Sequence, residues 1–111
     1  MPSQTRELLK GAVPLLVLAV LASEDGYGYQ IKARIEALTD GAVALTEGTL
    51  YPALHALERE GLVVGYWEDG GSARRRRYYQ LTYAGTQSLR AQRLVWSRFA
   101  AAVESVLSTT D

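Results

Sequence analysis

The residues best suited to a chemical task in this sequence are four consecutive arginines, Arg74, Arg75, Arg76 and Arg77. A guanidinium group donates hydrogen bonds in a planar fork that matches phosphate oxygens. Side chains alternate along a strand, so Arg75 and Arg77 share one face, and Arg74 and Arg76 share the other. We expect all four to pair with DNA phosphates or to enter a minor groove. The alternative is a solvated edge strand whose charges discourage aggregation.

The distribution of charge favours a local anion-binding surface. The 12 Lys and Arg side chains balance 12 Asp and Glu side chains, so the formal net charge is zero. Between residues 70 and 98, however, every formally charged side chain is an arginine: Arg74–Arg77, Arg90, Arg93 and Arg98. A local positive field is the electrostatic feature that a phosphate backbone requires.

A second set of polar side chains lies in residues 46–61, whose pattern is that of one amphipathic helix. Its apolar stripe consists of Leu50, Leu54 and Leu57. Thr46 or Thr49 can cap its N-terminus, and Gly61 suits a left-handed C-terminal stop. Because helix N-termini attract anions, we expect the exposed N-terminal half of this helix to contact DNA. The predicted contacts are Thr46, Gly48, Thr49, Tyr51, Pro52 and His55.

Two earlier helices must position this element. Residues 11–22 are apolar almost all round, with Pro14 in the first turn, so this helix is expected to be central or to lie in an interface. Residues 27–38 are amphipathic, and Tyr29 and Lys32 on the polar face are expected to brace the flanking DNA backbone. A short helix followed by one with a polar N-terminal face makes a helix-turn-helix plausible.

After Gly61 the spacing of apolar residues changes from the helical repeat of 3.6 residues to the strand repeat of 2 residues. Residues 62–68 and 74–81 are rich in β-branched and aromatic side chains, and the intervening residues 69–73 are rich in glycine. This pattern predicts a β-hairpin whose return strand carries the four arginines.

Residues 83–107 are expected to form a final helix, capped by Thr82. Leu89, Trp96 and Val103 recur every seven residues, and Phe99 falls in the complementary position of the same seam. Such a helix extends past a small core, and a second copy of the chain is the simplest cover for its apolar stripe. We therefore predict a homodimer.

Several motifs together resemble the PadR family of bacterial transcriptional regulators, in the form with a single C-terminal helix. They span Leu8 to Gly85, and a Trp-x-x-Phe pair at residues 96–99 extends the match. The motifs are Leu8-Leu9-Lys10-Gly11, Gly28-Tyr29-Gln30-Ile31, Gly48-Thr49-Leu50-Tyr51-Pro52-Ala53-Leu54, Leu57-Glu58-Arg59-Glu60-Gly61-Leu62, Gly71 with Arg74–Arg77-Tyr78-Tyr79, and Leu81-Thr82-x-x-Gly85. One departure is the uncharged spacer Ser72-Ala73 before the arginines.

The resemblance implies a homodimeric DNA-binding repressor that reads a two-fold symmetric operator. It also implies an effector, often aromatic or cationic and apolar, that binds near the dimer interface and releases the DNA. Trp96 and Phe99 are by default plain dimer core, and ligand contact is a compatible second role. The predicted effector-binding and dimer residues are Leu89, Arg93, Trp96, Phe99, Ala100 and Val103.

Other classes of function find little support in the composition. The chain has no cysteine and one histidine, and no metal-ligand spacing or catalytic triad is present, so we expect no enzyme activity, cofactor or metal. Two carboxylate pairs, Glu58 with Glu60 and Glu68 with Asp69, are expected to be solvated. The longest apolar run, residues 12–22, is too short to span a membrane, and a cytoplasmic protein is expected.

We therefore expect a mainly α-helical protein with a small β-hairpin, consisting of a winged helix-turn-helix domain (residues 1–82) and a long dimerisation helix (residues 83–111). The alternative function is a winged-helix module that docks on proteins and does not bind DNA.

Overall fold

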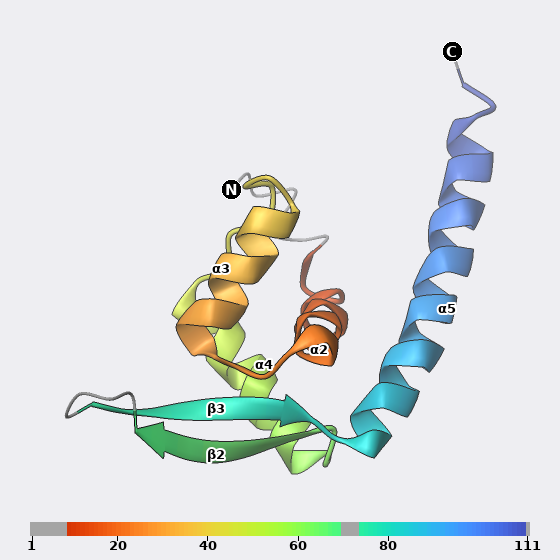
Figure 1. The fold of residues 1–111 in the computed structure, drawn as a ribbon. Coiled ribbons are helices and arrows are strands. Elements are labelled where there is room, and N and C mark those ends of the chain that lie inside the picture. Colours follow the sequence, from red (N-terminus) through yellow and green to blue (C-terminus); the bar gives the residue numbers. More distant parts are fainter. Residues whose placement is uncertain (1–8, 70–73, 111) are drawn as a thin grey trace.

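The computed structural model describes residues 9–69 and 74–110 of the chain. Its helices are α2 (Val13–Ser23), α3 (Gly28–Leu38), α4 (Glu47–Arg59) and α5 (Tyr83–Leu107), and its strands are β1 (Gly26–Tyr27), β2 (Val63–Asp69) and β3 (Arg75–Leu81). Helices α2 and α3 lie above the β2–β3 hairpin, which we call the wing, and α4 runs downward across the level of the wing (Figure 1). The expected mainly helical winged helix-turn-helix fold is thus confirmed. The predicted glycine-rich tip of the wing lies outside the described residues.

The core forms where the apolar faces of these helices meet the inner face of the wing. Its fully or almost fully buried side chains are Val17, Leu18, Ile31, Ile35, Leu50, Leu54, Leu57, Val63 and Tyr79. The stripe at 50, 54 and 57 is therefore the core face of α4, as its spacing predicts. Helix α2 is the central helix, since it contributes five buried residues and packs against α3, α4 and α5.

The ends of α4 agree with the sequence pattern. The Thr46 hydroxyl accepts a hydrogen bond from the Thr49 backbone N–H at 3.2 Å, so Thr46 is the N-cap. Gly61 has a φ of +75°, the left-handed conformation that ends a helix after its last turn.

The sheet differs from the prediction, because it has three strands in the order β1-β3-β2. Tyr27 was expected at the start of a helix, but Gly26 and Tyr27 pair with Tyr79 and Tyr78 of β3. The preceding turn is fixed by Arg34, which donates hydrogen bonds to the backbone carbonyls of residues 24 and 25. A two-residue strand has no periodicity of its own, which is why the pattern did not indicate it.

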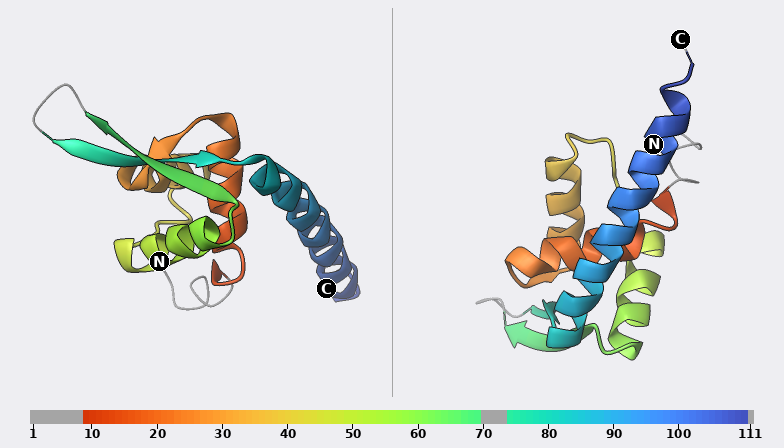
Figure 2. Two further views of the ribbon diagram at one scale, coloured as in Figure 1. Left: turned by 90° about the horizontal axis from the view of Figure 1, so that it is seen from below. Right: turned by 90° about the vertical axis from the view of Figure 1, so that its right-hand side faces the viewer.

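Helix α5 begins against the end of α4 and then leaves the body of the protein. The Thr82 hydroxyl caps α5 through the Gly85 N–H and donates to the Gly61 carbonyl at 2.7 Å. Gly85 is the only buried residue of α5. The C-terminal end of α5 projects beyond the other elements (Figure 2). Among residues 9–69 and 74–110, no helix is long and apolar enough to cross a membrane.

Candidate nucleic-acid interface

A cleft of about 440 Å³ lies between the N-terminal parts of α3 and α4 and the wing. It brings together eight of the twelve predicted DNA contacts from three elements distant in sequence. These are Tyr29 and Lys32 from α3, Tyr51 and His55 from α4, and Arg74, Arg75, Arg76 and Arg77 at the start of β3. Tyr27, Gly28, Glu47, Trp67 and Tyr79 complete its walls. Cationic, phenolic and imidazole groups therefore face one hollow.

On the α4 side, the Tyr51 ring lies across the N-terminus of α3. A Cβ atom added to Gly28 would collide with the Tyr51 hydroxyl and ring, so only glycine leaves this space open. The Tyr51 and His55 rings are neighbours, with centroids 6.4 Å apart. The Tyr51 hydroxyl makes no hydrogen bond to any residue that the structure describes, which leaves it free to serve a ligand.

On the wing side, Arg77 is partly buried and paired with an acidic residue of the same chain. Its Nη2 atom lies 2.6 Å from Oε2 of Glu58 on α4, and the Gly65 backbone N–H donates to the same oxygen at 3.3 Å. The expectation that Glu58 is solvated is therefore wrong. Its partner lies 19 positions away along the chain, and only the docking of the wing on α4 brings the two charges together. Arg77 is thus the arginine least available to a phosphate.

The other arginines of the run lie on both faces of the sheet, as the strand alternation predicts. The Arg75 guanidinium lies 5.3 Å from the centre of the Trp67 ring and makes a long, exposed ion pair of 3.5 Å with Asp69. The Arg76 guanidinium lies on the Tyr27 ring, at 4.7 Å from its centre. The Arg75 interactions are exposed, and those of Arg76 are only partly buried. Contacts of this kind are weak in water, so phosphates can compete for both arginines.

Four predicted contacts do not line the cleft. Thr46 and Thr49 instead border a separate hollow of about 240 Å³, together with Lys10 and residues of the α2 and α4 N-termini. Gly48 and Pro52 are exposed on α4 and line none of the hollows described here. All four nevertheless lie exposed in the N-terminal half of α4 or at its N-cap.

Trp67 is the most exposed aromatic residue among the five cleft residues that were not predicted as contacts. Trp67 is 53% exposed and lies on the same face of β2 as buried Val63. The sequence contained the pattern that places Trp67 here, because residues 63, 65 and 67 are spaced two apart and therefore lie on one face of the strand. A large aromatic side chain that continues the core face beyond the core must enter the cleft.

The predicted dimer and effector residues divide into two groups. Leu89 is partly buried against the core of its own chain. Trp96 and Phe99 are exposed by 49% and 61%, and they line a hollow of about 310 Å³ between α5 and the N-terminal end of α2. Arg93, Ala100 and Val103 are also exposed along α5.

These features define a class: a winged helix-turn-helix protein with a basic cleft and a projecting C-terminal helix. The model of the transcriptional regulator PadR-like family matches residues 17–91, and the chain belongs to this family. Among solved structures, a PadR family transcriptional regulator from Eggerthella lenta superposes with a TM-score of 0.82 at 33% identity, covering 97% of this chain and 92% of that chain.

Curated relatives agree with this assignment. Transcriptional regulator Rv3488 of Mycobacterium tuberculosis is 36% identical over 90 residues, which cover 79% of this chain and 78% of that protein. Transcriptional regulator YqjI of Escherichia coli is 32% identical over 83 residues, which cover 75% of this chain but only 38% of YqjI. The protein is thus a transcriptional regulator of the PadR-like family and not an enzyme.

Proposed function

We propose that this regulator binds double-stranded DNA as a homodimer and represses transcription, and that a small aromatic or apolar effector releases it. The observation that carries DNA binding is the cleft between α4 and the wing, where four arginines converge with Lys32, Tyr29, Tyr51 and His55. In this arrangement the N-terminal half of α4 enters the major groove, and the wing follows the backbone towards the adjacent minor groove.

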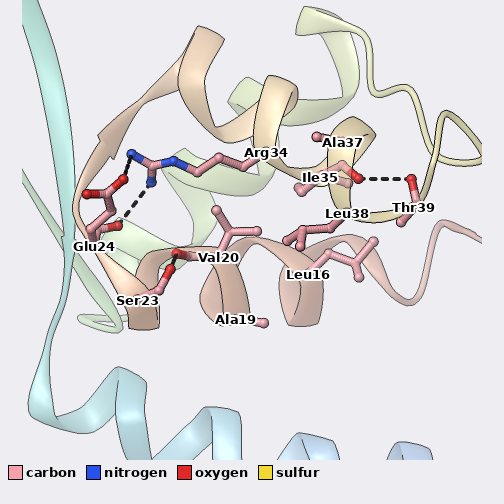
Figure 3. A pocket seen from close by; sticks show the side chains of 10 residues that line it. All are labelled: Leu16, Ala19, Val20, Ser23, Glu24, Arg34, Ile35, Ala37, Leu38 and Thr39. Atoms are coloured by element: carbon pink, nitrogen blue, oxygen red, sulfur yellow. Dashed lines mark hydrogen bonds and ion pairs between the residues drawn. The ribbon is translucent and has the colours of Figure 1, made fainter.

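Exposed apolar surface supports the homodimer. The C-terminal two-thirds of α5 exposes Leu94, Val95, Trp96, Phe99, Val103, Val106 and Leu107. An apolar groove of about 480 Å³ lies between α2 and α3 (Figure 3). Leu16, Val20, Ile35 and Leu38 line it, and the Arg34–Glu24 ion pair lies at one end. If the partner's α5 covers both the apolar stripe of α5 and this groove, both apolar surfaces are removed from water.

The position of Trp96 supports an effector site at the same interface. The hollow beside Trp96 and Phe99 is lined mainly by apolar groups. Two copies of Trp96 brought together there would offer flat faces to an aromatic ligand. A ligand that prefers one separation of the two α5 helices would change the spacing of the two α4 helices.

DNA binding is tested by selecting duplexes from a random-sequence library with the full chain. Binding is then measured by fluorescence anisotropy at several salt concentrations, with heparin retention as an independent readout. We expect enrichment of a two-fold symmetric sequence with half-sites about 34 Å apart, and affinity that falls with salt. Failure to enrich any duplex, together with salt-independent retention, would instead favour a protein-docking module.

A further inference from the structure

Trp67 has a position that packing of the core does not explain. It lies opposite Arg77 in the β2–β3 register, on the strand face that buries Val63, yet the residue is about half exposed. The exposed part lies in the cleft, whose α4 wall carries Tyr51 and His55. An uncovered indole therefore stands in the space proposed for DNA.

Two arginine side chains of β3 also lie close to the ring. The guanidinium carbons of Arg75 and Arg77 lie 5.3 Å and 5.6 Å from its centre. Arg77 is itself fixed by Glu58, so one of the two neighbours is anchored to α4. Cation–π contacts of this kind orient the ring without using the indole N–H. The indole N–H has no hydrogen-bond partner among the residues that the structure describes.

We infer that Trp67 is a DNA contact, and that it binds the sugar–phosphate backbone that passes between α4 and the wing. This inference rests on the proposed DNA binding. A chain that places a helix in the major groove and a wing at the adjacent minor groove encloses the strand between those grooves. The indole N–H is a donor only, which suits a phosphate oxygen, and the flat ring packs on a deoxyribose.

A neutral backbone contact has a signature that separates it from the arginines around it. Loss of a phosphate-pairing arginine reduces the slope of log affinity against log salt by about 0.9, because fewer counterions are released. Loss of a neutral hydrogen bond and ring contact lowers affinity at every salt concentration and leaves the slope unchanged. Backbone contacts do not depend on base sequence, so selected and random duplexes should be affected alike.

The experiment compares the full-length protein with Trp67→Phe and Trp67→Ala on the library-selected duplex and on a random-sequence duplex. Val64→Ala is the matched control, because Val64 is an exposed neighbour on the opposite face of β2. We expect Trp67→Ala to weaken binding to both duplexes about fivefold or more without a change in salt slope. Trp67→Phe should lose part of this affinity, and Val64→Ala should bind like the wild type.

A second measurement does not depend on the stability of the alanine variant. In Trp96→Phe protein, Trp67 is the only tryptophan, and added duplex should protect its fluorescence from acrylamide quenching. Quenching that does not change on adding duplex would overturn the inference while DNA binding by the wild type stands. So would a loss of DNA affinity below twofold in Trp67→Ala, or a reduced salt slope in that variant. Absence of wild-type binding to either duplex would overturn the proposed function and this inference together.

Discussion

The carboxylate of Glu58 on α4 lies 2.6 Å from the guanidinium of Arg77 on β3, and this ion pair joins the wing to the helix proposed to enter the major groove. Both side chains are about two-thirds buried. The backbone N–H of Gly65 donates to the same Glu58 oxygen, so both strands of the wing are tied to one acceptor. The angle between α4 and the wing therefore depends on this acidic residue.

Arg75 and Arg77 should consequently differ in their contribution to DNA binding. Arg75→Ala should weaken binding to selected and random duplexes alike and reduce the salt slope by about 0.9. Arg77→Ala should change the slope less and lower the thermal stability more, because it leaves Glu58 partly buried without its cation. Anisotropy titrations over a salt series and thermal unfolding measure the two effects. Equal slope changes in both variants would show that Arg77 leaves Glu58 and pairs with phosphate.

Tyr51 is expected to contact DNA through its hydroxyl. Tyr51→Phe removes only that group and should lower DNA affinity by about 1 kcal/mol, which is about fivefold, with little change in stability. Gly28→Ala should have a related effect from the neighbouring helix, because its methyl group collides with the Tyr51 ring and moves it. Thermal unfolding and anisotropy separate the two properties. Reduced stability with unchanged DNA binding in Tyr51→Phe would make Tyr51 a packing residue.

The homodimer prediction is tested on the exposed stripe of α5. Light scattering at micromolar concentration should give the mass of two chains. Obligate interfaces commonly bury more than about 2,000 Å², and a dimer held by such an interface stays together at this concentration. Val103→Glu should shift the protein to monomers, because a charge is buried without a partner at the interface. Ala101→Glu, which introduces the same charge on the other side of α5, should remain dimeric. A monomeric wild type would contradict the prediction.

Trp96→Ala should abolish the response to an aromatic ligand and leave DNA binding largely intact, provided that the dimer survives. The probe is the aromatic dye anilinonaphthalene sulfonate, whose binding should quench Trp96 emission in Trp67→Phe protein. If a ligand lowers the affinity of the protein for DNA, DNA must lower the affinity for that ligand by the same factor. Dye binding by Trp96→Ala with wild-type affinity would place the pocket elsewhere and leave Trp96 as dimer core.

Alkaline pH should weaken the link between the wing and the α2–α3 turn. The Tyr66 hydroxyl donates to the Asp25 carboxylate at 2.7 Å, and this hydrogen bond, with desolvation, raises the pKa of Tyr66 to about 12. The unfolded chain loses the phenolic proton near pH 10. The stabilisation is therefore complete below about pH 10 and is lost as the pH rises through about 12.

Tyr66→Phe should accordingly be less stable than the wild type at pH 8, and the difference should shrink between about pH 10 and 12. Tyr83→Phe, at a phenol that is 80% exposed, should follow the wild type throughout. Urea unfolding followed by circular dichroism measures both comparisons. A difference between wild type and Tyr66→Phe that does not change with pH would contradict the role given to Asp25.

The amino-acid sequence by itself determined the elements whose signals are local. The spacing of Leu50, Leu54 and Leu57, a threonine at the N-terminal end and glycine at position 61 defined α4, because helix periodicity and capping act within a few residues. The structure then selected Thr46 over Thr49 as the N-cap. The alternation along β3 likewise separated Arg75 and Arg77 from Arg74 and Arg76.

Only the tertiary structure decided which of these residues meet. Strand β1 exists because Gly26 and Tyr27 reach β3, more than 50 positions later, and no local pattern encodes that pairing. The same holds for Glu58 with Arg77 and for Tyr51 with Gly28, whose contacts depend on how α3, α4 and the wing dock. Periodicity identifies the face that a residue occupies, whereas packing of the shared core decides what lies opposite that face.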